Sequence, residues 1–244
     1  SQARMLRGMA GVWGPLPAAE VIQLVEGGVA RGAVARARML ALQGRFAEAQ
    51  VVVAQASQSL AELGDRIGLS ICHEVAGLVA RLSGDSGEAV RNLQLSYDEL
   101  IALGDQAFAS TRAGFLAEAY LEAQELDEAW QYAGIARDTS ASDDIASQSL
   151  GRRIQARVLS ARGQHAEAEA LAREAVAIMG RTDYLVMHGD ALVHLGQVLY
   201  AAGKVDEAVA AAREAVELYD RKGATFLAER TRELLEEWRR EAGR

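Results

Sequence analysis

Apolar residues along most of this chain recur every three or four positions, the spacing that gathers them on one face of an α-helix. A representative run is Ile71, Val75, Leu78, Val79 and Leu82. Glycine or a short polar residue interrupts the pattern at intervals of about 20 residues. The pattern therefore predicts an all-α chain of helices paired into antiparallel hairpins.

The interruptions themselves repeat in phase. The motif Gly-x-x-x-Glu-Ala begins at residues 44, 84, 163 and 203, and a variant beginning at Gln124 keeps the Glu-Ala pair. Successive copies are 40, 40, 39 and 40 residues apart. A constant period of this length is typical of stacked repeats, in which each unit buries its apolar face only against its neighbours. The sequence thus predicts an α-α superhelix.

The residues that interrupt the apolar pattern predict where the helices end and begin. The motif glycine suits the left-handed residue that ends a first helix, and the Asp or Ser of a second landmark, such as Leu63-Gly64-Asp65, suits an N-cap. First helices are predicted at 29–43, 66–83, 106–123, 145–162 and 184–202. Second helices are predicted at 46–63, 86–102, 126–139, 165–180 and 205–221, with a last helix at 225–240.

These ranges divide the chain into an N-terminal capping segment with a helix (1–28), five hairpins (29–223) and a C-terminal capping helix (224–244). Small residues recur in register on the paired helices. They are Ala49, Ala89, Ala129, Ala168 and Ala208 on the second helices, and Ala37, Gly77, Ala117, Ala156 and Gly196 on the first. Because small side chains let helix axes approach to about 8–10 Å, these positions should form the seams.

Composition narrows the function classes. The net charge of −8 argues against a general nucleic-acid surface, which needs a basic excess. The only cysteine is Cys72, so neither an intramolecular disulfide nor a multi-cysteine metal site can form. The longest apolar runs are too short for a membrane span. These features together favour a cytoplasmic protein.

The repeat resembles a known family. Leu195-Gly196-x-x-Leu199 followed by Gly203-x-x-x-Glu207-Ala208 resembles the tetratricopeptide repeat (TPR). The period of about 40 exceeds that repeat's usual length of about 34, and its tryptophan and terminal proline are missing here. The resemblance implies a right-handed solenoid that binds proteins or peptides.

A more specific resemblance covers most of the chain. The segments that carry it are Trp13-Gly14-Pro15-Leu16-Pro17, Asp143-Asp144-Ile145-Ala146-Ser147-Gln148, Leu171-Ala172-Arg173-Glu174-Ala175-Val176, Arg181-Thr182-Asp183-Tyr184 and Leu218-Tyr219-Asp220-Arg221-Lys222-Gly223. They look like the C-terminal repeat region of bacterial multidomain adenylate/guanylate cyclase-like proteins with an AAA-type ATPase module, or of large LuxR-type transcription regulators. The resemblance implies a regulatory or scaffolding part without catalysis. Because the chain opens at Ser1, we expect a fragment of a longer protein.

A search for catalytic, cofactor and metal motifs yields none. Gly27-Gly28-x-x-x-Gly32 lacks the lysine and preceding strand of a phosphate-binding loop, so a helix junction is expected there. His188 and His194 are six residues apart and do not share a helical face. Trp13 is expected to cap the first hairpin, with contact to a preceding ATPase module as the alternative.

Ligand candidates lie on the first helices, which line the concave side of such solenoids. The inward-facing polar positions are Arg31, Arg38, Glu74, Arg81, Thr111, Glu118, Arg153, Arg157, Asp190, Gln197 and Tyr200. The arginines could hold a carboxylate or an acidic peptide by bidentate hydrogen bonds. The alternative is that they are solvated residues paired with the groove carboxylates.

Two functions follow. The first is a non-catalytic repeat module that mediates protein–protein interaction and regulation in a bacterial signalling protein, binding a partner, its own ATPase module or a second copy. The second is a sensor that binds a small molecule or peptide in the groove. A deep closed pocket with converging arginines would favour the sensor, whereas an open groove or an outer apolar patch would favour a protein partner.

Overall fold

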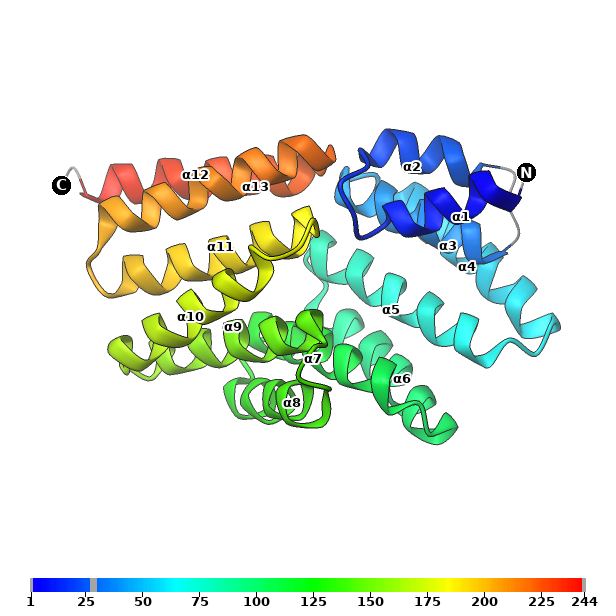
Figure 1. Cartoon of the computed structure of the whole chain (residues 1–244), viewed down its shortest axis with the longest axis horizontal. Coiled ribbons are helices and arrows are strands. Elements are labelled where there is room, and N and C mark those ends of the chain that lie inside the picture. The colour runs from blue at the N-terminus through cyan, green and yellow to red at the C-terminus, as the bar shows by residue number, and fades with distance from the viewer. Residues whose placement is uncertain (1, 27–29, 243–244) are drawn as a thin grey trace.

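The computed structural model describes residues 2–26 and 30–242, with side chains over 6–26 and 30–241. Gly27 and Gly28, and with them the expected helix junction, lie outside the described residues. All regular structure in the described part is α-helical and winds into a curved array of hairpins (Figure 1). The predicted all-α superhelix of TPR-like hairpins is therefore confirmed.

Two short helices precede the described hairpins and one longer helix follows them. The short helices are α1 (Gln2–Gly11) and α2 (Ala18–Val25). The hairpins pair α3 (Ala30–Leu42) with α4 (Phe46–Glu62), α5 (Arg66–Ser83) with α6 (Ser86–Leu103), α7 (Gln106–Glu122) with α8 (Leu126–Thr139), α9 (Ile145–Ala161) with α10 (His165–Met179), and α11 (Leu185–Ala201) with α12 (Val205–Lys222). The last helix is α13 (Thr225–Ala242).

The predicted hairpin and terminal helices begin within one residue of the observed starts and end within two residues of the observed ends. The N-terminal segment differs from expectation, because it forms two helices instead of one. Pro17 is the N-cap of α2, and the residues between the helices form a separate loop. That loop helps to close the concave side of the solenoid.

Left-handed residues end the first helices, as predicted. Gly44, Gly84, Gly163 and Gly203 have φ of 76°, 91°, 78° and 77°. Gln124 occupies the same place in the variant motif and is the non-glycine residue with positive φ, at 65°, among those described. Such a conformation is disfavoured for a residue with a Cβ, so glycine is the favoured residue of this turn, although Gln124 also adopts the conformation.

Aspartates start several of the following helices. The side chains of Asp65, Asp105 and Asp144 accept hydrogen bonds of 2.9, 3.2 and 3.1 Å from the backbone N–H three residues further on. This satisfies one of the donors that a helix leaves unpaired at its start. The predicted N-caps at these landmarks are confirmed.

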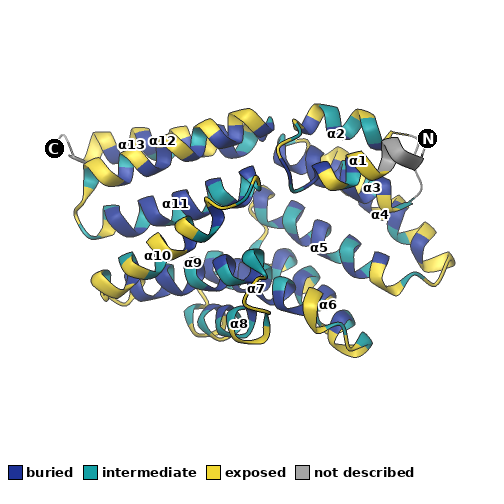
Figure 2. Ribbon diagram, in the orientation of Figure 1, coloured by how far each residue is buried: buried dark blue, intermediate teal, exposed yellow. Residues whose placement is uncertain are grey.

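The small-residue positions form the seams between paired helices. All five second-helix alanines are fully buried. A Cβ on Gly77 would lie 2.6 Å from Leu93 Cγ, and one on Gly196 would lie 3.1 Å from the carbonyl oxygen of Ala208. Both distances are too short for a larger residue without displacement. Figure 2 shows the buried residues lining the inner faces of the helices.

The array curves until its two ends meet. Lys222, at the end of α12, donates hydrogen bonds from Nζ to the carbonyl oxygens of Gly11 (2.5 Å) and Gly14 (2.7 Å). Phe46 of α4 packs edge-on against Phe226 of α13, with ring centroids 5.0 Å apart. Figure 1 shows the loop after α1 beside the end of α12. The N-terminal segment therefore closes the concave side of the solenoid.

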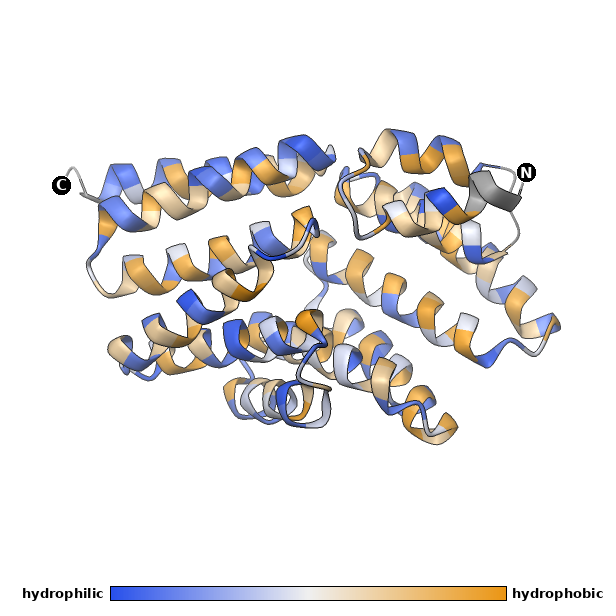
Figure 3. Ribbon diagram, viewed as in Figure 1, coloured by the Kyte–Doolittle hydropathy of each residue, from blue (hydrophilic) through white to orange (hydrophobic). Residues whose placement is uncertain are grey.

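The outer surface is mixed in character. Figure 3 shows many hydrophilic residues on α12 and α13, whereas α5 alternates hydrophobic and hydrophilic positions along its length. Among the helices described, none combines the length and the apolar character needed to cross a membrane.

Candidate functional site

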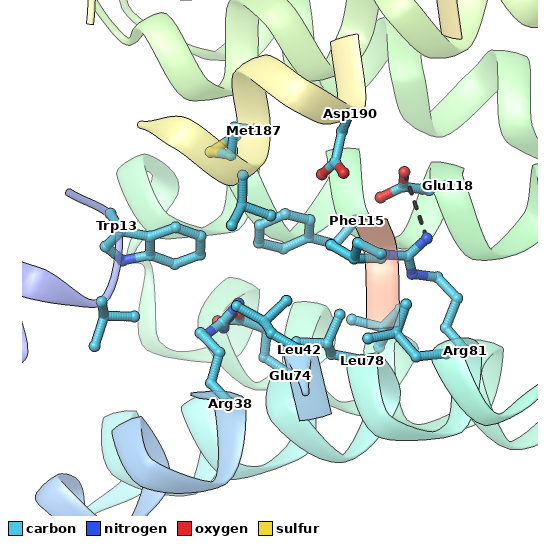
Figure 4. A pocket seen from close by; sticks show the side chains of 15 residues that line it. Trp13, Arg38, Leu42, Glu74, Leu78, Arg81, Phe115, Glu118, Met187 and Asp190 are labelled. Atoms are coloured by element: carbon cyan, nitrogen blue, oxygen red, sulfur yellow. Dashed lines mark hydrogen bonds and ion pairs between the residues drawn. The ribbon is translucent and has the colours of Figure 1, made fainter. Parts of the chain in front are cut away.

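The closed concave side contains three hollows that share lining residues. The central cavity has a volume of about 50 Å³ and lies among Trp13, Leu78, Phe115 and the side chains drawn in Figure 4. On one side it meets a cavity of about 260 Å³, here called the aromatic cavity, lined by Trp13, Phe108, Phe115 and Tyr184. On the other side it meets an open polar cleft of about 730 Å³.

Two arginines share one carboxylate in the floor of the aromatic cavity. Arg112 Nη2 of α7 lies 2.5 Å from Glu74 Oε2, and Arg38 of α3 bonds to the other oxygen of Glu74. All three side chains are nearly inaccessible, with 7% of Arg38, 6% of Arg112 and 2% of Glu74 exposed. Burial lowers the pKa of Arg38 to about 9, aided by the charges of Arg112 and Arg81. Burial also lowers the pKa of Arg112, to about 10.

A second buried cluster surrounds Glu118 of α7. Arg153 of α9 donates from Nη2 to Glu118 Oε2 at 3.0 Å, and its Nη1 lies 3.0 Å from Oε1. Arg81 Nη1 of α5 is 3.5 Å from Oε1 and 2.8 Å from Glu122 Oε1. Burial alone would raise the pKa of Glu118, but Arg153 and Arg81 outweigh it and hold that pKa at about 2.

These pairs join consecutive first helices. Each ion pair links a side chain to one roughly a repeat away: Arg38 with Glu74, Arg81 with Glu118, and Glu118 with Arg153. At the far end, Asp190 of α11 accepts a hydrogen bond of 2.6 Å from the Tyr219 hydroxyl of α12. Burial raises the pKa of Asp190, and Arg153 opposes that rise. The concave side thus carries two clusters of buried charges, one around Glu74 and one around Glu118.

Trp13 projects from the N-terminal loop into the centre. Its ring stacks on Phe115 of α7 at a centroid distance of 6.2 Å, with 8° between the planes. The Arg38 guanidinium carbon lies 4.3 Å from the Trp13 ring centroid, a cation–π contact visible in Figure 4. The expectation that Trp13 caps the first hairpin was incomplete, because its ring reaches the third hairpin and lines the central and aromatic cavities.

Most of the predicted groove residues do face these hollows. Nine of the eleven line one of them: Arg31, Arg38, Glu74, Arg81, Thr111, Glu118, Arg157, Asp190 and Gln197. Arg153 lies beneath the surface and supports Glu118. Tyr200 lies apart, stacked on Trp238 of α13 at 4.9 Å with its hydroxyl bonded to Glu241.

The expectation that the groove arginines are solvated was wrong for Arg38 and Arg153, which are 7% and 2% exposed. The carboxylates predicted as their partners, Glu74, Glu118 and Asp190, are the ones that these two arginines contact. The closure of the solenoid explains the difference, since an open groove would leave the same pairs in water.

Sequence reasoning missed Arg112 and Phe115. The helix orientation assumed for α7 placed Thr111 and Glu118 facing the groove, and it gave Arg112 and Phe115 no place there. A usable signal was present, because Glu74 stands near one repeat spacing from both Arg38 and Arg112. The described residues contain no group of three or more His, Cys, Asp or Glu side chains arranged to hold a metal ion.

Comparison with known proteins defines the class of repeat. Sequence profiles of the tetratricopeptide repeat match residues 30–55 and residues 149–221. The chain therefore contains a TPR-like region. Repeats of this class generally mediate protein–protein interaction. No curated protein sequence matches the chain.

Solved structures agree on the fold. BtubC (BKLC) from P. vanneervenii superposes with a TM-score of 0.58 at 18% identity, over 82% of this chain and 81% of that one. A protein described as a kinesin light chain of Podospora anserina, with nearly identical TPR-like repeats, superposes with a TM-score of 0.53 at 19% identity, over 77% and 93%. At these identities the similarity shows the TPR-like solenoid alone.

Proposed function

We propose that this chain is a non-catalytic repeat module that mediates protein–protein interaction and regulation within a larger signalling protein. The TPR-like repeats support a protein-interaction role. The parent is proposed to be a bacterial cyclase-like or LuxR-type regulator with an ATPase module, supported by the sequence resemblance alone. In this proposal the module is cytoplasmic, with residues 29–223 as the repeat array between terminal caps.

The outside of the solenoid is the surface that a protein would meet. The Trp13 loop covers the centre of the concave side, which leaves the central and aromatic cavities and the open polar cleft. Apolar side chains are also exposed at the turns that join successive hairpins, where Leu63 is 76% exposed and Phe108, which also lines the aromatic cavity, is 53% exposed. Ile67 and Ile101 are exposed at the same two turns. We call these four residues the apolar edge.

The observation that carries this proposal is the apolar edge, in which exposed apolar side chains recur at two of the turns that join successive hairpins, since exposed apolar surface marks interaction sites. The test is to identify the parent reading frame, express its remaining part and measure its association with this module. The double variant Leu63→Glu/Ile101→Glu is expected to weaken association. Val51→Glu, an exposed apolar residue on the outer face of α4, is the matched control and should bind normally. Unchanged binding of the double variant would contradict the assignment.

A second candidate function is a small-ligand sensor, and a specific observation favours it. The concave side is closed, and Arg38 and Arg112 converge on one spot in the floor of a 260 Å³ cavity. Ligand sites in proteins are typically concave and mostly apolar, with a few convergent polar groups. A ligand there would contact α3, α5, α7 and the Trp13 loop together, and so would favour the closed state.

The sensor function is tested by screening small molecules for thermal stabilisation. A compound that binds only the folded closed state stabilises it, and the melting temperature rises with the logarithm of the ligand concentration over its dissociation constant. The expected result is a hit whose effect disappears in Ala146→Phe, because Ala146 lines the aromatic cavity and a benzyl group would occupy it. Hits that act equally on this variant would bind elsewhere and would count against the sensor.

A further inference from the structure

We propose that the aromatic cavity binds a small amphipathic monoanion, a carboxylate on a body the size of one aromatic ring, with its anionic end at Arg112 and Arg38. The proposal rests on the sensor function and names the ligand class for the same cavity.

Charge in the floor of the cavity is unbalanced. Arg38 and Arg112 both bond to the single carboxylate of Glu74. Arg31 at the rim is already matched by Asp65, with Nη2 2.8 Å from Oδ2. The floor therefore holds one more positive charge than negative charge, away from water. Such a charge is strongly unfavourable until an anion compensates it, and a bound carboxylate would do so.

Neighbouring groups do not remove this excess. Arg81 adds a positive charge whose field reaches Arg38. Asp105, at the N-cap of α7, is the further carboxylate that acts on Arg112, but among the described residues the ion pair of Arg112 is with Glu74, and Asp105 acts only at longer range. The rings of Trp13 and Phe115 supply cation–π contacts to Arg38 and Arg112, at 4.3 and 6.0 Å, without a formal charge.

A hydrogen-bond donor in the floor is unused. Arg112 Nε is buried and meets no acceptor among the described residues, although the residue is only 6% exposed. Buried donors are normally paired, because losing water without a new partner is costly. The unpaired Nε therefore adds to the uncompensated charge of the Arg112 guanidinium, which lines the cavity and would give a ligand carboxylate a strong charge-assisted bond.

The other residues that line the aromatic cavity suit the apolar part of such a ligand. Trp13, Phe115, Ile71, Val34 and Met187 surround the cavity. Its volume of about 260 Å³ exceeds the roughly 150 Å³ that holds one benzene molecule in an engineered protein cavity. The volume that remains beside an aromatic ring would hold a short chain ending in the carboxylate. The chemistry thus selects an arylacetate or a compact branched carboxylate over a sugar or a peptide.

The polar cleft on the other side lacks this selectivity. Its arginines, Arg81, Arg157, Arg230 and Arg240, are accompanied by acidic side chains, among them Glu118, Glu122, Glu233 and Glu237. The cleft is also open to solvent over a volume of about 730 Å³. Arg157 in this cleft also has a buried Nε without an acceptor among the described residues, but the open cleft offers a small anion no dry apolar wall.

The experiment compares three probes that share a benzyl group but differ in charge: phenylacetate, phenylacetamide and benzylammonium. Thermal shift and calorimetry are measured at millimolar concentration and low salt. Phenylacetate is expected to raise the melting temperature and to bind at least about tenfold more tightly than the neutral amide, since bonds to charged groups are the stronger ones. Benzylammonium should not bind.

Variants locate the site. Arg112→Met leaves Glu74 paired with Arg38 and should weaken phenylacetate binding by about tenfold or more. Arg91→Met, which removes an exposed arginine of α6, is the matched control and should bind normally. Should Arg112→Met fail to fold, Ala146→Phe keeps both floor arginines and is expected to abolish binding by filling the space.

The outcomes separate the ligand class from the sensor function. Equal binding of the amide and the carboxylate, blocked by Ala146→Phe, would overturn the anion proposal and leave the sensor standing. Phenylacetate binding that survives both variants would overturn the site. The absence of binding by all three probes would overturn the ligand class, and the wider screen described above would then decide the sensor.

Discussion

Replacing Arg153 by Met should destabilise the protein far more than a surface substitution would. Arg153 is 2% exposed and donates to Glu118. Methionine keeps the helix propensity and most of the length of arginine but removes the charge. The substitution leaves the Glu118 carboxylate buried without its nearest partner.

The structure sets the expected magnitude. Removing one member of a buried ion pair typically costs about 3–5 kcal/mol, because the remaining charge is uncompensated. Glu118 keeps Arg81 at 3.5 Å, which places the expected loss near the lower end, at about 3 kcal/mol. Arg152→Met is the matched control. Its side chain lies on the same helix and pairs with an exposed Glu174, so a loss of at most about 1 kcal/mol is expected.

Urea unfolding followed by circular dichroism measures the difference, with the midpoint and the slope fitted separately. The double variant Arg153→Met/Glu118→Leu removes both charges and leaves Arg81 paired with Glu122. It should be more stable than Arg153→Met alone, since the buried unpaired carboxylate is gone. If Arg153→Met lowers the free energy of unfolding by less than about 0.5 kcal/mol, the closed concave side is refuted, because only a solvated arginine can be replaced at so small a cost.

Three further predictions concern packing and pH. Gly196→Leu should lower the melting temperature by several degrees, because a Cβ there meets Ala208 and Trp238 at 3.1 Å, whereas Gly87→Leu on the exposed face of α6 should not. Ala129→Leu, at a fully buried seam position, should have a similar effect, and an unchanged melting temperature in both seam variants would count against the packing scheme. Burial holds the pKa of His194 well below its usual value of 6.5. The unfolded chain therefore takes up a proton there as pH falls below about 6.5 while the folded chain does not, so stability falls by up to about 1.4 kcal/mol per pH unit. His194→Gln should reduce that slope in pH-dependent urea unfolding, and an unaltered slope would exclude this cause.

The repeat unit could be predicted from the sequence because its causes are local. The turn glycines, the capping aspartates and the seam alanines each act on neighbours within one hairpin, and each recurs at the same phase. Gln124 illustrates this strength, since the turn keeps its left-handed residue even where glycine is replaced.

Closure could not be predicted, because it depends on the curvature that accumulates over the whole array. The contacts that close it, Lys222 with Gly11 and Gly14 and Phe46 with Phe226, occur once each and carry no period. In the sequence, Lys222 belongs only to a segment that carries the family resemblance, and Trp13 was expected to act as a local cap. Their roles emerge only when residues about one hundred to two hundred positions apart meet, Trp13 with Phe115 and Lys222 with Gly11. The same closure turns the groove arginines from solvated residues into buried ones.

The most direct test of the closed centre is a distance measurement across the point where the two ends meet. Spin labels at Ala19 of α2 and Arg221 of α12, both exposed, can be introduced in a Cys72→Ala background and read by double electron–electron resonance. A Cβ on Gly223 would lie 3.7 Å from the backbone nitrogen of Ala18, so the labelled helices are neighbours. We predict one narrow distribution at short separation. A broad distribution extending to long separations would show an open solenoid and would contradict the closed cavities on which the sensor assignment depends.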